Sequence, residues 1–111
     1  MPKVLIVNHD EDTMELIKMW LIKNGLEAKC TSEDEAISVM KEFKADVLLV
    51  DVNQIEAAKK IKQEKELANT PIVVMAGYTL ILRDYTNIAN EVIRKPFEPK
   101  EVVNKIRKVL K

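Results

Sequence analysis

The 111-residue sequence contains one cysteine, two glycines and no long apolar segment, and each shortage excludes a class of protein. Cys30 has no second cysteine with which to form an internal disulfide bond, so we expect a reduced thiol in the core. Two glycines are too few for a Gly-rich phosphate loop or for the close backbone approach that a large cofactor such as cobalamin needs. No stretch reaches the roughly 20 apolar residues of a membrane span or has the form of a signal peptide. We therefore expect a cytoplasmic protein with no membrane partner.

The 18 acidic and 18 basic residues cancel, so the sequence has no net charge that would favour one kind of partner. Acids nevertheless exceed bases in residues 1–53, and bases exceed acids in residues 94–111. No aromatic residues interleave with the C-terminal lysines, and no helix-turn-helix pattern is present, so we expect no nucleic-acid partner. With 47% hydrophobic and 32% charged residues, the composition predicts one globular domain over residues 1–111.

Helix and strand patterns alternate along the chain, which predicts an α/β domain built on a parallel sheet. Continuous apolar runs at residues 47–50 and 72–75 indicate strands that are buried on both faces. Further strands are predicted at residues 4–7 and 92–93. Residues 26–30 alternate apolar and charged side chains, which is typical of a half-exposed strand. We therefore expect this strand at an edge of the sheet.

Five helices are predicted between and after these strands. Capping-box spacing occurs at Asp12 with Glu15 and at Ser32 with Glu35, which predicts two helix starts. The first of these helices should end near Gly25. The last helix should begin at Pro99, and residues 79–90 carry a diluted apolar pattern that predicts the remaining helix. The predicted buried faces are Leu16, Ile17, Trp20 and Leu21; Ala36, Val39, Met40 and Phe43; Ile55, Ala58 and Ile61; and Val102, Val103, Ile106, Val109 and Leu110.

The residues that follow four of the predicted strands should meet at one edge of the sheet. In an open parallel sheet, ligands bind at the carboxyl ends of the strands, near the point where the strand order reverses. The residues at these strand ends are Asn8, His9 and Asp10; Asp51; Ala76 and Gly77; and Lys95. We therefore expect a common site at this edge.

Four segments of the sequence resemble the receiver domain of two-component response regulators: KVLIV with polar residues after it, ADVLLVD, PIVVMAGY and RKPFEPKEVVNKIRKVLK. The resemblance spans nearly the whole chain, and Lys-Pro-Phe directly after a strand is its most distinctive part. It implies a flavodoxin-like (βα)5 three-layer sandwich with strand order 2-1-3-4-5. It also implies that Asp51 accepts a phosphoryl group, that Lys95 contacts this group and that the Lys95–Pro96 bond is cis.

The metal positions of the receiver family are altered in this sequence. In the family, a pair of acidic residues after the first strand holds Mg²⁺ beside the acceptor, with a backbone carbonyl two residues past the aspartate. Asn8, His9 and Asn53 stand at those positions here, and Asp10 reaches a metal only if its loop is re-routed. Mg²⁺ requires oxygen ligands in near-octahedral geometry. We therefore predict a degraded Mg²⁺ site formed by these four residues and Asp51, with weak Mg²⁺ binding at most.

Ala76 stands where the family has a threonine or serine whose hydroxyl bonds the phosphoryl group, and alanine has no donor. Without the acidic pair, the charges of Asp51 and Lys95 cancel, so we predict an ion pair between them where metal and phosphate would bind.

Two further roles for His9 stay open. It would ligate zinc or another later transition metal together with Asp51 and Asp10, or it would sense pH beside Asp51.

Two functions remain open from the sequence. The first is a stand-alone pseudo-receiver, which is not an enzyme, has no output domain and signals through protein contacts with Asp51 unmodified. The three altered site positions favour it. The second is a phosphorylatable receiver in which Asp51 takes phosphate from a histidine kinase. In both, the partner is a kinase or effector, and the resemblance implies a contact face formed by the helix at 79–90, the strand at 92–93 and the last helix, with Val92, Phe97 and the lysines of residues 100–108.

Overall fold

A five-stranded parallel sheet forms the centre of the molecule. The computed structural model describes residues 1–77 and 87–110. In these residues the strands are β1 (Lys3–Val7), β2 (Glu27–Thr31), β3 (Val47–Asp51), β4 (Ile72–Ala76) and β5 (Glu91–Arg94). They lie side by side in the order β2-β1-β3-β4-β5, with all pairs parallel. The predicted parallel sheet and its strand order are confirmed.

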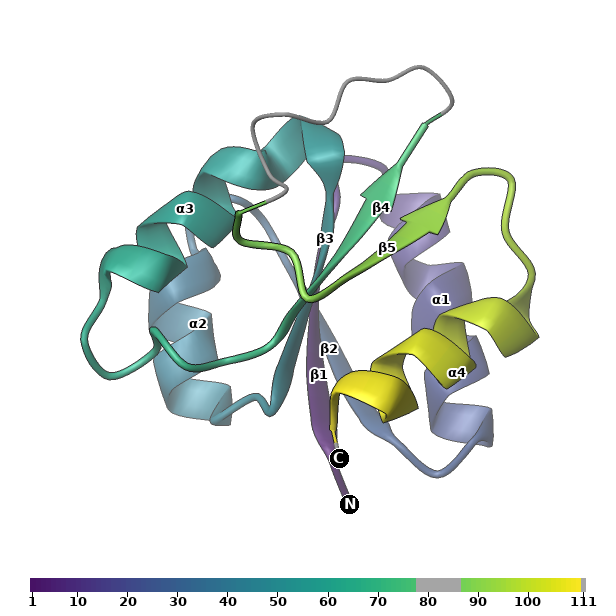
Figure 1. The fold of residues 1–111 in the computed structure, drawn as a ribbon. Coiled ribbons are helices and arrows are strands. Elements are labelled where there is room, and N and C mark those ends of the chain that lie inside the picture. Colours follow the sequence, from purple (N-terminus) through teal and green to yellow (C-terminus); the bar gives the residue numbers. More distant parts are fainter. Residues whose placement is uncertain (78–86, 111) are drawn as a thin grey trace.

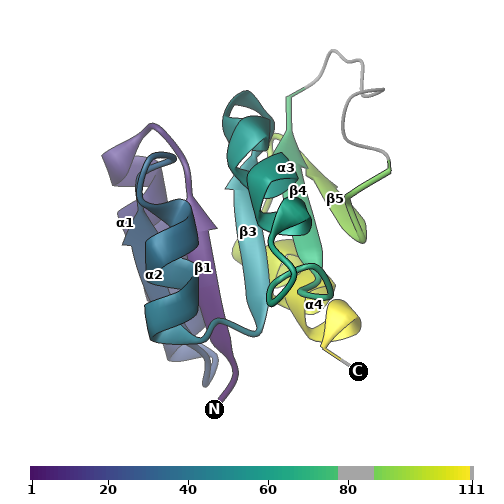
Figure 2. The ribbon, with the colours of Figure 1, turned by 90° about the vertical axis from the view of Figure 1, so that its left-hand side faces the viewer.

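Helices cover both faces of the sheet and make three layers (Figure 1). The helices α1 (Glu11–Lys23) and α4 (Pro99–Val109) lie on one face. The helices α2 (Ala36–Phe43) and α3 (Ile55–Gln63) lie on the other, and a short 3-10 helix, η1 (Val52–Gln54), joins β3 to α3. Figure 2 shows α2 and α3 in front of the sheet. Each helix thus buries one apolar stripe against the sheet.

The alternation of side chains along each strand divides the core in two. In β1, Val4 and Ile6 pack toward α1 and α4, whereas Leu5 and Val7 pack toward α2 and α3. The central strands β1, β3 and β4 are buried on both faces, as their continuous apolar runs predict. The alternating strand β2 lies at an edge and is partly exposed, as predicted.

The predicted count of five helices is wrong for the part of the chain that is described, where there are four α-helices. The helix predicted at residues 79–90 falls mainly on residues 78–86, which lie outside the described residues. Its last four residues, 87–90, form a turn and a bend instead of a helix. The side-chain oxygen of Asn90 accepts the backbone N–H of Ile72 at 2.8 Å. This bond joins the bend before β5 to the start of β4.

Both predicted capping boxes are wrong in detail. The cap of α1 is Asp10, whose side chain accepts the backbone N–H of Asp12 at 3.1 Å and the Thr13 hydroxyl at 2.7 Å. Asp10 accepts an N–H group that would otherwise be free in the first turn. The helix therefore begins at Glu11, and Asp12 lies within its first turn and is not its cap. The chain after Ser32 first makes a turn, and α2 begins only at Ala36 without a side-chain cap.

The helix ends and buried faces agree more closely with the sequence. Gly25, with φ of +83°, follows the end of α1, and Pro99 opens α4, as predicted. Leu16 is an exception because it is 47% exposed, whereas Met14 is buried. The buried stripe of α1 is therefore rotated toward Met14, Ile17 and Leu21. No helix within residues 1–77 and 87–110 is long and apolar enough to cross a membrane.

Candidate functional site

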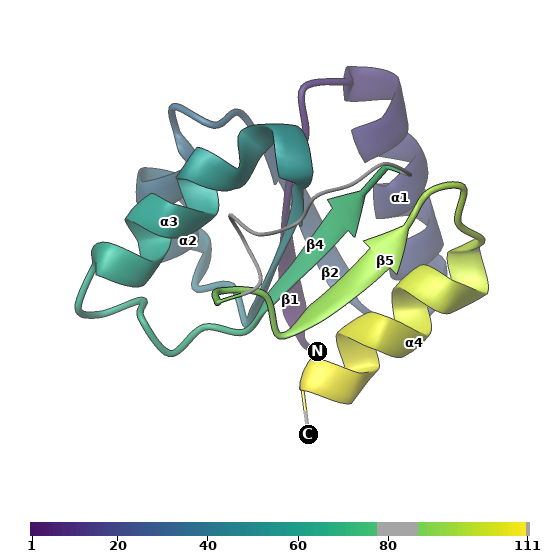
Figure 3. The same ribbon diagram turned by 45° about the horizontal axis from the view of Figure 1, so that its top comes forward.

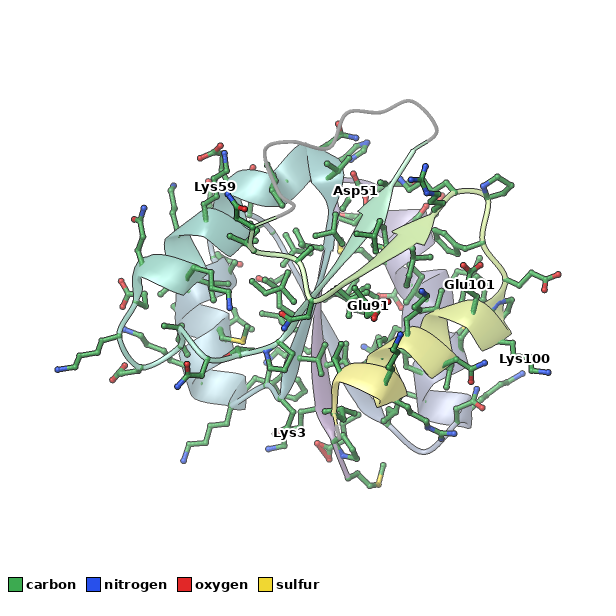
Figure 4. The ribbon with its side chains drawn as sticks, viewed as in Figure 1. Lys3, Asp51, Lys59, Glu91, Lys100 and Glu101 are labelled. Carbon is green, nitrogen blue, oxygen red and sulfur yellow. The ribbon has the colours of Figure 1, made fainter. Side chains whose placement is uncertain are left out.

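Asp51 lies at the carboxyl end of β3 and is fully buried (Figure 4). Its Oδ1 accepts the backbone N–H of Asn53 at 2.9 Å, a bond formed because η1 turns directly after the strand. Its Oδ2 accepts the Lys95 ammonium group, which forms an ion pair with it. Both carboxylate oxygens of Asp51 therefore already have partners within the chain.

Lys95 is held beside Asp51 by the sheet. Its backbone N–H donates to the carbonyl oxygen of Ala76 at 2.9 Å. This bond holds Lys95, which follows β5, beside the end of β4. The Lys95–Pro96 bond is cis, as the resemblance implies. The side chain of Lys95 is 36% exposed, so the ion pair is buried on the carboxylate side and reached by water on the ammonium side. The predicted ion pair is thus present, and its role stays a prediction.

The residues after β1 bond to one another and to the start of α1. Asn8 is 4% exposed, and its Oδ1 accepts the backbone N–H of Asp10 at 3.0 Å. Asp10 is exposed and caps α1, and the hydrogen bond from the Thr13 hydroxyl lowers the pKa of its carboxyl. His9 is exposed, and within the described residues it makes no hydrogen bond to Asp51.

Several of the donor groups predicted for Mg²⁺ already have partners within the chain. Asp51 has both oxygens bonded, the oxygen of Asn8 already accepts a hydrogen bond, and Asp10 serves α1. Among residues 1–77 and 87–110, no group of three or more His, Cys, Asp or Glu side chains is placed to hold a metal ion. Mg²⁺ takes oxygen ligands in near-octahedral geometry, and the degraded Mg²⁺ site stays a prediction. The same finding leaves the transition-metal role of His9 without support.

Ala76 ends β4 and is 2% exposed, and β4 lies between β3, which ends at Asp51, and β5, which Lys95 follows. In the register of the sheet, Met75 lies beside Asp51, and Ala76 lies beside Arg94. The structure therefore brings the predicted residues Asp51, Ala76 and Lys95 to one edge of the sheet.

A second set of ionic contacts, which sequence reasoning missed, lies on the predicted partner face. Glu91 at the start of β5 forms ion pairs with Lys105 and Lys108 of α4, each at 3.0 Å (Figure 4). These bonds lower the pKa of Glu91. The spacing of the two lysines on one helix face was a usable signal, but nothing in the sequence pointed to Glu91 as their partner.

Phe97, also predicted for the partner face, is half-buried. Its ring packs edge-to-face against Trp20 of α1, with the ring centroids 6.0 Å apart. Trp20 is half-buried at the edge of the same core cluster. This contact fastens the segment before α4 to α1, so only part of the Phe97 ring is free to meet a partner.

Comparison with known proteins identifies the relatives of this chain. The profile of the response regulator receiver domain matches residues 4–107. The transcriptional regulatory protein SrrA of Staphylococcus aureus is 26% identical over 118 residues, which cover 98% of this chain and 48% of SrrA. The chain thus spans about half the length of the curated relatives it matches.

Solved structures show the same fold. The chemotaxis protein CheY4 of Vibrio cholerae superposes with a TM-score of 0.89 at 22% identity, covering 99% of each chain. A CheY-like response regulator receiver domain from Methylobacillus flagellatus gives a TM-score of 0.86 at 16% identity, covering 98% of each chain. The sheet order and layers described above are those of this flavodoxin-like fold.

Proposed function

The chain belongs to the response regulator receiver domain family, and we propose that it acts as a pseudo-receiver, in which Asp51 stays unmodified and the folded domain signals through protein contacts. Receiver domains are signalling modules that interact with histidine kinases and effectors. The proposal concerns how this member does so. In this proposal, the surface of the domain binds the partner protein, and signalling does not require phosphorylation of Asp51.

The occupation of Asp51 is the observation that carries the proposal. Phosphoryl transfer to a carboxylate needs an oxygen in line with the incoming phosphorus, and it needs positive charge around the phosphoryl oxygens. Asp51 has no exposed surface, and its oxygens are bonded to the Asn53 N–H and to Lys95. An incoming phosphoryl group would therefore have to displace Lys95, the cation it also needs.

The charge balance of the edge supports the same reading. Where the family carries an acidic pair after the first strand, this chain has Asn8 and His9, so the site contains one carboxylate instead of about three. One lysine neutralises it without a metal ion. Ala76 also lacks the hydroxyl that would bond a phosphoryl group and couple it to the neighbouring surface.

The partner surface that we propose lies on β5 and α4. Val92 and Phe97 are half-buried there, and Lys100 is exposed at the start of α4 (Figure 4). The other two lysines of this helix, Lys105 and Lys108, form ion pairs with Glu91. Lys100 is therefore better placed to meet an acidic partner. A kinase or effector that loses affinity with Lys100→Glu but not with Lys60→Glu, an exposed lysine of α3, would support this surface. Equal loss with both variants would count against it.

A phosphorylatable receiver remains the second candidate. It is favoured by the contact between Asp51 and Lys95, because the family's acceptor and its lysine are both retained and meet at the carboxyl edge of the sheet. In that case, the lysine would move from the carboxylate to the phosphoryl group on phosphorylation.

An amide NMR titration separates the two candidates. The ¹⁵N-labelled protein is titrated with Mg²⁺ and then with beryllium fluoride, which mimics a phosphoryl group. Asp51→Asn serves as the matched control because asparagine keeps the shape and removes the charge. The pseudo-receiver predicts no shifts at Asp51, Asn53 or Lys95 beyond those of the control. Large shifts at these residues that vanish in Asp51→Asn would establish the second candidate.

A further inference from the structure

A pocket of about 660 Å³ opens beside the Asp51 site but does not include Asp51. It lies between the start of α1, the end of β2 with the loop after it, and η1. Figure 3 turns the carboxyl edge of the sheet, where the pocket lies, toward the viewer. Its polar lining comes from segments that are distant in sequence, among them Asn8, Thr31 and Gln54. The fold, and not one local loop, therefore builds this pocket.

Three buried polar atoms without partners gather in its wall. In the described part of the chain, the buried side-chain polar atoms that lack a hydrogen bond are Asn8 Nδ2, Thr31 Oγ1 and Gln54 Oε1, and all three residues line the pocket. Asn8 is 4% and Thr31 is 7% exposed. The Asp10 N–H bonds to Asn8 Oδ1, which identifies Nδ2 as the free donor. Buried polar groups without partners cost free energy, so their concentration in one wall points to a ligand that supplies the missing bonds.

The rim of the pocket is acidic. Glu11 and Glu15 reach it from α1, and Glu33 and Asp34 reach it from the loop after β2. No lysine or arginine lines the pocket, and none of the ion pairs within residues 1–77 and 87–110 involves these four carboxylates. His9 is the only base in the lining. The electrostatic field of the pocket therefore favours a cation and disfavours phosphate or any other anion.

We propose that this pocket binds a guanidinium group, as carried by arginine, together with a neutral carbonyl oxygen next to it. A guanidinium group has five N–H donors in a planar fork and no acceptor, so it suits carboxylates spread around a rim and the oxygens of Thr31 and Gln54. The carbonyl oxygen accepts the free donor of Asn8. Because the three unpaired atoms in the wall are buried, we expect their side chains to turn toward the ligand when it binds.

A metal ion fits the pocket less well than an organic cation. The acidic residues are not gathered into a cluster able to hold a metal within the described residues. A guanidinium group spreads its charge over several bonds and does not require such a cluster. The proposal depends on the pocket alone and is independent of whether Asp51 is phosphorylated.

The test is an amide NMR titration of the whole chain with Nα-acetyl-arginine amide, which carries a guanidinium group and neutral carbonyl groups. Nα-acetyl-citrulline amide has the same shape without the charge and is the matched control ligand. We expect saturable shifts at Asn8, Thr31 and Gln54 with the arginine compound, with a Kd on the order of 1 mM, and none with citrulline. Absence of saturation up to about 10 mM, or equal shifts with citrulline, would overturn the proposal.

Variants identify the groups that bind. Glu33→Gln combined with Asp34→Asn should weaken binding by about fivefold or more, whereas Glu42→Gln, an exposed carboxylate on α2 outside the pocket, should leave it unchanged. Thr31→Val should weaken binding and yet raise the melting temperature of the free protein, because the unpaired hydroxyl is removed. Loss of binding with Glu42→Gln equal to that with the rim variants, or full binding by Thr31→Val, would contradict the assignment.

A last comparison identifies the source of the guanidinium group. Free arginine carries an α-ammonium and an α-carboxylate group and so offers the Asn8 amide no neutral carbonyl oxygen, which means that a pocket built for a peptide-linked arginine should bind the acetylated amide more tightly. This result would indicate an arginine side chain of a partner protein. Tighter binding of free arginine would indicate a small metabolite as the source of the same group.

Discussion

The Asp51–Lys95 ion pair can be weighed by removing the lysine charge. Lys95→Met keeps a long apolar side chain and leaves Asp51, which is fully buried, with one hydrogen bond from the Asn53 N–H. Removing one partner of a buried ion pair typically costs about 3–5 kcal/mol. Because the Lys95 side chain is 36% exposed, solvent screens the pair, and we expect about 2–3 kcal/mol. This loss is a large part of the free energy of unfolding of a typical domain, which is about 5–15 kcal/mol. For a domain of this size, the loss should lower the melting temperature by roughly 10 °C.

The assay is urea unfolding near neutral pH, followed by the fluorescence of Trp20, the only tryptophan. Wild type, Lys95→Met, Asp51→Asn and the double variant form a double-mutant cycle. In the Asp51→Asn background the carboxylate is gone, so Lys95→Met should cost less than about 0.5 kcal/mol. Lys60→Met, which removes an exposed lysine of α3, controls for the loss of a surface charge.

Two results would refute this reasoning. The first is a Lys95→Met variant within about 0.5 kcal/mol of wild type, which would mean that Asp51 does not depend on Lys95 for its charge balance. The second is the same loss in both backgrounds, which would mean that Lys95 acts through the packing of its aliphatic stem.

Three further predictions concern other parts of the domain. Because its ion pairs with α4 hold the pKa of Glu91 below the ordinary 4.5, Glu91→Gln should cost about 1 kcal/mol near neutral pH. The gap should close as the pH falls through that lowered pKa, and urea titrations that show a constant gap would contradict this. Phe97→Leu should cost about 1 kcal/mol and alter the emission of Trp20, its edge-to-face partner; unchanged emission would argue against the contact. Burial, and secondarily a nearby carboxylate, raises the pKa of the Cys30 thiol, so iodoacetamide should alkylate it more slowly than a cysteine in an unfolded peptide, with equal rates counting against the prediction.

The sheet could be predicted from the sequence because its signals are strong and local. The continuous apolar runs of β3 and β4 and the alternation in β2 reflect how many faces of each strand are buried, and this property survives in the sequence. The strand order came from the family resemblance and not from the pattern. Helix starts were less predictable, because Asp10 and Asp12 are both good caps and the choice between them depends on how the chain leaves β1.

The site could be predicted in part for a related reason. That Asp51 and Lys95 meet follows from their places at the ends of β3 and β5, together with the requirement that a buried carboxylate has a partner. The unpaired atoms of Asn8, Thr31 and Gln54 could not be predicted, because an unmet hydrogen bond is a property of three-dimensional packing. Whether the domain acts without an output domain stays a prediction.

The distance in sequence between Asp51 and Lys95 has a consequence for folding. Forty-four positions separate the two residues, so β3 places a carboxylate in the interior long before the chain supplies the cation that balances it. A chain that emerges from its amino terminus, or one cut before β5, has to leave this acid in water and keep β3 open. Closure of the sheet around Asp51 is therefore tied to the arrival of the last strand, which makes the central strand β3 and the edge strand β5 fold as one cooperative unit.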